Sequence, residues 1–116
     1  MDEYVKVLIY PEARWLTPKE KGQIPSNKIP QMFMFEDDTI HVLRTVVCER
    51  AVSRKVGGRG FRFVCQVNWD DNTKVKIKES IIWYDDFYDE WFVEVPKDWA
   101  VNKGMEYQDF EYTARR

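Results

Sequence analysis

Histidine, cysteine and glycine are scarce in this sequence, and it contains no long apolar run. Its two cysteines, Cys48 and Cys65, are too few for a disulfide framework and are typical of small buried side chains in a cytoplasmic protein. The apolar stretches fall far short of the roughly 20 residues that a membrane-spanning helix needs. The N-terminal residues MDEYVKVLIYPEA include acids where a signal peptide carries basic residues. We therefore expect a cytoplasmic protein that does not associate with a membrane.

The scarcity of histidine limits the chemistry that the chain can perform. The single histidine, His41, has no neighbours that would complete a set of nucleophile, base and orienting group. A zinc site built from His41, Cys48 and Cys65 would lack a fourth ligand and the usual ligand spacing. The acidic residues between 85 and 90 lack the glycine and the terminal glutamate of a calcium-binding loop. The sequence therefore predicts no catalytic residue, no metal site and no cofactor.

What the chain has in quantity is apolar and aromatic residues. Hydrophobic residues make up 44% of it and aromatic residues 16%, which is too apolar for a disordered protein. A length of 116 residues is typical of one domain, so we expect residues 1–116 to form a single domain with a hydrophobic core. The formal net charge of −2 provides no overall attraction to nucleic acid or to a membrane surface.

Apolar and polar residues alternate most clearly in residues 61–69, FRFVCQVNW. The odd positions carry Phe61, Phe63, Cys65, Val67 and Trp69. This period of two predicts a strand with one buried face. Residues 73–84 follow the same pattern, with one face formed by Val75, Ile77, Ile81 and Trp83. The turn-forming residues 70–72, Asp-Asp-Asn, lie between the two strands, so the pair predicts a meander.

Four further segments have strand-like patterns: residues 4–10, 31–36, 39–50 and 91–95. In residues 39–50, one face carries Ile40, Val42, Val46 and Cys48. Strands joined by short turns predict an all-β fold, a curved antiparallel meander of about five or six strands that closes into a small barrel. We expect its core to contain Phe61, Phe63, Val67, Trp69, Val75, Ile77, Ile81, Trp83, Trp91 and Val93.

Two segments lack a clear strand pattern. Residues 11–30 hold four prolines, and Thr17-Pro18-Lys19-Glu20 resembles a helix start. We expect a long N-terminal loop there, with at most one short helix. Residues 97–116 form a polar and aromatic tail, for which a short helix and a docked strand are both compatible with the sequence.

The segment VSRKVGGRGFRF, residues 52–63, contains three glycines and four basic residues. A phosphate-binding loop leads into a helix, whereas a strand pattern follows Gly60. The segment therefore predicts a β-hairpin with a two-residue turn at Gly57-Gly58, and Gly60 would mark a bulge or a strand start. That turn gives the pairs Val52–Phe63, Cys48–Val67 and Val46–Trp69. A wider loop that sets Cys48 opposite Cys65 preserves the same facing, so both registers remain open.

Charge is distributed unevenly along the chain. Residues 44–62 include six basic residues and one acid, a balance of +5, whereas residues 85–111 include nine acids and two lysines, a balance of −7. Three interpretations remain open. The two regions are solvated faces that attract each other within one molecule. Otherwise the basic hairpin binds a polyanion with aromatic residues as stacking platforms, or the acidic, aromatic C-terminal third binds a basic protein surface.

Four stretches carry a family likeness: FMFEDDTIHV (33–42), AVSRKVGGRGFRFVCQV (51–67), IIWYDD (81–86) and WFVEV (91–95). Their most specific part is a small and a basic residue followed by Gly-Gly-x-Gly, arginine and an aromatic residue. In these stretches the chain resembles a group of small β-rich proteins of Firmicutes, often found in mobile or phage-like regions. That family has no known activity, so the resemblance implies a compact β fold and a mobile-element context but no site residues.

We therefore expect a non-enzymatic small β-barrel binding module whose partner is a protein or a nucleic acid. For a nucleic acid, the predicted phosphate contacts are Arg54, Lys55, Arg59 and Arg62. The alternative is a mobile-element accessory or inhibitor protein that binds a basic protein partner through its acidic, aromatic third. The predicted contacts are then Asp85, Asp86, Tyr88, Asp89 and Glu90.

Overall fold

The computed structural model describes residues 3–53, 59–70, 76–108 and 112–114. Its strands are β1 (Tyr4–Ile9), β2 (Glu12–Trp15), β3 (Lys28–Phe35), β4 (Asp38–Ser53), β5 (Arg59–Asp70), β6 (Lys76–Asp85), β7 (Glu90–Pro96) and β8 (Tyr112–Ala114). Its helices are the short 3-10 helix η1 (Glu20–Gly22) and α1 (Lys97–Asn102). Neither helix in these ranges has the length and apolar content needed to cross a lipid bilayer.

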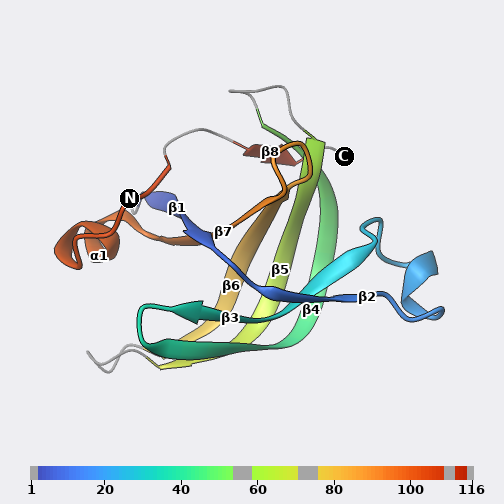
Figure 1. Ribbon diagram of the computed structural model, residues 1–116, viewed down its shortest axis with the longest axis horizontal. Coiled ribbons are helices and arrows are strands. Elements are labelled where there is room, and N and C mark those ends of the chain that lie inside the picture. Colours follow the sequence, from blue (N-terminus) through green and yellow to red (C-terminus); the bar gives the residue numbers. More distant parts are fainter. Residues whose placement is uncertain (1–2, 54–58, 71–75, 109–111, 115–116) are drawn as a thin grey trace.

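All strands join one antiparallel sheet, in the order β1-β7-β6-β5-β4-β3-β2, and β8 adds to β4 outside this path. The all-β antiparallel prediction is therefore confirmed. The sheet curls into a half-barrel, and β1 and β2 at its two ends are separated in the chain by only Tyr10 and Pro11. Figure 1 shows β1 and β2 as one run that crosses in front of the curled strands. Within the described ranges these two end strands do not pair with each other, so the ladder is more open than the closed barrel that the sequence predicts.

The prediction of a loop over residues 11–30 is wrong in part, because this segment contains β2 and the beginning of β3. The predicted helix start does form a short turn, η1. The backbone N–H of Thr17 donates to Glu20 Oε1 at 3.0 Å, and the N–H of Glu20 donates to Thr17 Oγ1 at 3.3 Å. This reciprocal pair satisfies two donors that a helix end would leave free. Residues 97–116 contain both of the elements considered for them, the helix α1 and the docked strand β8.

The main core lies on the concave face of the sheet. Five of the predicted core residues are buried in it, namely Phe63, Val67, Trp69, Trp91 and Val93. Phe61 and Ile77 are partly buried against it, and Val75 lies outside the described residues. Contacts from β1 and α1 close the core, because Val5, Ile9 and Ala100 belong to the same cluster.

The prediction that Ile81 and Trp83 belong to this core is wrong. A register shift between β5 and β6 changes the phase of β6, because Gln66 pairs with Glu79 whereas Trp69 pairs with Ile77. Ile82 consequently faces the main core and is fully buried. Trp83 packs instead in a smaller cluster with Ala51 and Phe92, with Ile81 partly buried beside them.

The structure also corrects the register of the β4–β5 hairpin. The observed pairs are Val52–Arg59, Cys48–Phe63 and Thr45–Cys65, so neither predicted register occurs. Gly57-Gly58 lies outside the described residues. Two register shifts in β4 fall between Val42 and Arg44 and between Thr45 and Val47. The second shift explains why Val46, predicted to face inward, is 42% exposed.

Candidate functional site

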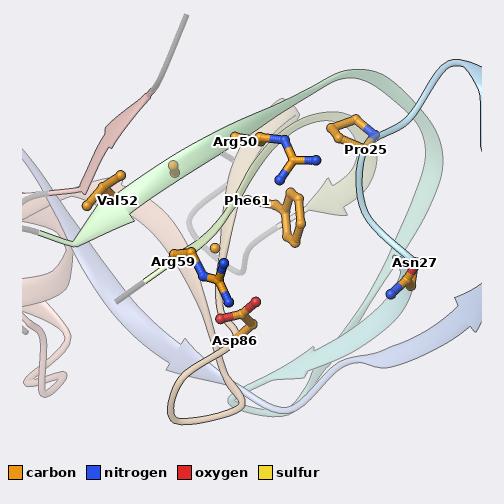
Figure 2. A pocket seen from close by; sticks show the side chains of 9 residues that line it. Pro25, Asn27, Arg50, Val52, Arg59, Phe61 and Asp86 are labelled. Carbon is orange, nitrogen blue, oxygen red and sulfur yellow. The ribbon is translucent and has the colours of Figure 1, made fainter. Parts of the chain in front are cut away.

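A pocket of about 310 Å³ opens at one end of the half-barrel (Figure 2). Three parts of the chain line it: residues 25 and 27 before β3, residues 50–52 of β4 with residues 59–61 of β5, and Asp86 after β6. The pocket therefore lies where the β4–β5 hairpin, the β6–β7 turn and the β2–β3 connection meet. Of the basic residues that the structure describes, Arg50 and Arg59 line it.

Strand pairing explains why the two arginines lie at the same end of the same face. Arg50 is directly opposite Phe61, and Arg59 precedes Phe61 by two residues, so all three share one face of the sheet. Figure 2 shows the guanidinium group of Arg50 turned toward Phe61 and that of Arg59 turned toward Asp86. Among the described residues, neither guanidinium group forms an ion pair within 4.0 Å. Both side chains thus line the pocket without a carboxylate of the described residues in ion-pair contact.

The β6–β7 turn is fixed against this pocket by its backbone. The N–H of Asp86 donates to the carbonyl of Arg59 at 3.0 Å. Gly60 allows this approach, because a Cβ at that position would lie 1.8 Å from the carbonyl oxygen of Tyr84. The buried Asp85 shapes the turn, since its Oδ1 accepts from the N–H groups of Phe87 at 2.9 Å and Tyr88 at 3.3 Å. Asp86 is thus placed at the pocket by main-chain contacts.

A second pocket of about 200 Å³ extends the first toward β2. Asn27, Phe61 and Asp86 line both pockets, and the second adds Trp15 and Lys28. We call the combined pockets the mouth, defined by Trp15, Lys28, Arg50, Arg59, Phe61 and Asp86. Three cations and one carboxylate give these residues a local excess of positive charge, although the whole chain has a net charge of −2.

Tyr84 lines the second pocket from β6. Burial, helped by a 2.7 Å hydrogen bond from its hydroxyl to Asp89 Oδ1, raises the pKa of Tyr84 to about 12. Tyr84 is therefore neutral at physiological pH and adds no negative charge to the mouth. Its ring packs against Trp91 with a centroid distance of 4.4 Å, which links the mouth to the core.

The basic residues predicted from the sequence do not gather in one place. Arg59 lines the mouth, whereas Arg54 and Lys55 lie outside the described residues. Arg62 lies on the opposite face of the sheet, 3.4 Å from Glu49 and 5.7 Å from the centre of the Trp83 ring. The prediction omitted Arg50. Arg50 belongs to the run of basic residues 44–62 and could have been found there, but the prediction considered only the residues near the hairpin tip.

The predicted acidic contacts are also divided. Asp85 is only 2% exposed and organises its own turn, and Asp86 lines the mouth. Asp89 accepts the hydroxyl of Tyr84 and has a φ of 54°, while Glu90 is partly buried in β7. Tyr88 is 54% exposed. Sequence reasoning missed its neighbour Phe87, which is 69% exposed and packs edge-on against Tyr88 with a centroid distance of 4.8 Å.

Within the described residues, the remaining titratable groups do not assemble into a second chemical site. His41 is exposed on β4, between Met32 of β3 and Asn68 of β5. No group of three or more histidine, cysteine, aspartate and glutamate side chains within the described ranges could hold a metal ion. The mouth is therefore the candidate site, and its side chains suit binding of an anion with a planar ring.

Comparisons with protein-family models, with curated proteins and with solved structures find no match for this chain. The resemblance to small proteins of Firmicutes therefore stays a prediction.

Proposed function

We propose that this protein is a non-enzymatic binding module that binds a nucleic acid through its mouth. The observation that carries the proposal is a pair of guanidinium groups, Arg50 and Arg59, that line an open pocket beside Phe61 and form no ion pair with any residue that the structure describes. Arginine presents a planar set of donors that matches the oxygens of a phosphate group. An aromatic ring between two phosphate contacts provides a surface for a base.

The charge of the molecule makes this binding local and sensitive to salt. The net charge of −2 repels a polyanion weakly at long range, so the attraction must come from the mouth. Each phosphate contact releases counterions, and the binding constant therefore falls as salt concentration rises. Lys28 adds a third cation, whereas Asp86 offsets part of the charge beside Arg59.

The test compares wild type with the double variant Arg50→Gln/Arg59→Gln in binding a labelled oligothymidine of about ten nucleotides, followed by fluorescence anisotropy. We expect the double variant to bind at least about tenfold more weakly at low salt. The slope of log K against log salt should fall in magnitude by about 1.4, because two single-strand phosphate contacts are lost. The matched control is Arg44→Gln/Lys78→Gln, which removes the same charge from exposed positions outside the mouth.

The control variant should keep both the affinity and the salt slope close to those of wild type. Equal losses of affinity in the two double variants would mean that binding depends on the total charge of the protein and not on the residues of the mouth. No binding at low salt by wild type would reject the proposal.

One observation favours a second candidate function, binding of a basic protein partner. Phe87 and Tyr88 form an exposed aromatic pair on a turn that Asp85 holds in shape, and Asp86 and Asp89 flank the pair. Exposed aromatic residues beside acids are typical of protein interfaces. Such a partner would suit the role of an accessory or inhibitor protein from a mobile element. A basic partner that co-purifies with wild type but not with Phe87→Ala/Tyr88→Ala would support this candidate.

A further inference from the structure

We propose that the mouth binds single-stranded nucleic acid with one base stacked on Trp15. This inference rests on the proposed function and specifies its ligand. Trp15 lies outside the basic hairpin, and stacking on its ring would favour a single strand over a duplex.

Among the exposed aromatic residues that the structure describes, Trp15 is distinguished by where its ring lies. It is 70% exposed, although an indole ring usually buries most of its surface. Trp15 lines the second pocket of the mouth. Phe61 lines this pocket too, and it also lines the first pocket, which contains Arg50 and Arg59. Tyr10 is more exposed, at 83%, but lines neither of these pockets. Trp15 is therefore an open aromatic surface next to the phosphate contacts.

Strand pairing fixes the position of this ring. Trp15 is the last residue of β2 and pairs with Lys28 at the beginning of β3. The ammonium group of Lys28 lies 5.0 Å from the centre of the Trp15 ring. A base stacked on the exposed part of the ring would carry its own phosphate close to this ammonium group. The next phosphates along the strand would reach Arg59 and Arg50 across Phe61.

The size and chemistry of the mouth favour a single strand. Its two pockets, of about 310 and 200 Å³, are small and lie side by side, whereas a duplex is far too wide to enter them. In a duplex the faces of the bases are stacked on one another and cannot contact a protein ring. In a single strand each base has a free face, and stacking on an aromatic residue strengthens binding regardless of base identity.

The test uses three labelled probes of equal length: oligothymidine, an oligomer of the same backbone in which every residue is abasic, and the oligothymidine annealed to its complement. The first two carry the same phosphates and differ only in their bases. We expect wild type to bind oligothymidine roughly fivefold or more tightly than the abasic oligomer. The duplex should bind no more tightly than the abasic oligomer.

Two variants then assign the difference to a residue. In Trp15→Ala the affinities for oligothymidine and the abasic oligomer should agree within about twofold, whereas Tyr10→Ala should keep the wild-type ratio. Circular dichroism checks that both variants are folded. Equal, salt-sensitive binding of both oligomers by wild type would overturn the stacking proposal and leave the proposed function standing. An unchanged ratio in folded Trp15→Ala would also overturn it, and binding to neither oligomer would reject the proposed function itself.

Discussion

At the scale of single residues, Gly60 decides how the mouth is built. It is buried, and it lies opposite both Ala51 of β4 and Asp85 of β6. The missing side chain lets the backbone of Tyr84 approach closely, which brings the β6–β7 turn to Arg59. The role of this glycine is therefore steric, since it is needed for contact between two strands.

We expect Gly60→Ala to lower the free energy of unfolding by about 1–3 kcal/mol, because its Cβ would meet a backbone oxygen that has to move. Urea denaturation measures the loss. The control is Gly22→Ala in η1, where a Cβ would have no atom within 4 Å. This control should change stability by less than about 1 kcal/mol. A loss in Gly60→Ala no larger than in Gly22→Ala would contradict the steric role.

Strand parity predicted the facing of single residues well in β5, and it failed beyond the register shifts, at Val46 of β4 and at Ile81 and Trp83 of β6. The alternation in residues 61–69 correctly assigned Phe63, Val67 and Trp69 to the core. The same parity assigns Arg59 and Arg62 to opposite faces, as the structure shows. The predicted phosphate contacts were instead grouped by their proximity in the sequence, which places residues of both faces in one site. Arg50 was missed because its position opposite Phe61 depends on the hairpin register.

At the scale of elements, the β4–β5 hairpin shows why that register was not predictable. A shift of two residues keeps every side chain on the same face, so apolar alternation cannot distinguish the possible pairings. The register shifts in β4 add a second uncertainty, because extra residues change the phase within one strand. The short strand β2 was missed for another reason: its four residues, Glu-Ala-Arg-Trp, show no buried face.

The observed register makes a prediction about the thiols. Cys48 lies opposite Phe63 and Cys65 opposite Thr45, and both thiols are free. Burial raises the pKa of Cys48 to about 12 and that of Cys65 to about 11. We expect reaction with a disulfide reagent at pH 8 to be slow in the folded protein, because the thiolate is the reactive form. In denaturant without reductant, two thiols should react at once.

These raised pKa values also set an alkaline limit on stability. The unfolded chain ionises its thiols near pH 9, whereas the folded protein keeps them neutral to higher pH. Stability should therefore fall as pH rises from about 9 toward 11 or 12.

The thiol count tests the register itself. Fewer than two reactive thiols in the denatured, unreduced protein would show a disulfide and contradict the observed register.

At the scale of the whole molecule, the half-barrel brings distant parts of the chain to one end. The mouth combines β2 and the β2–β3 connection with the β4–β5 hairpin and the β6–β7 turn. The sequence predicted the all-β class because alternation is local. It did not predict the mouth, because the β2–β3 pair with Trp15 and Lys28 reaches the end of the sheet that carries Arg50 and Arg59 only after the sheet curls. At one point the basic hairpin and the acidic C-terminal third come together, because the N–H of Asp86 donates to the carbonyl of Arg59 and the guanidinium group of Arg59 is turned toward Asp86 (Figure 2).

The most direct test of the mouth as the binding site is a titration of the ¹⁵N-labelled protein with oligothymidine, followed by two-dimensional NMR. We predict that the indole N–H of Trp15 and the backbone amides of Arg50, Arg59 and Phe61 shift in a dose-dependent way. The indole N–H of Trp83, on the opposite face, should not move. Shifts confined to the surroundings of Trp83 and Arg62, or to Phe87 and Tyr88, would contradict the assignment of binding to the mouth.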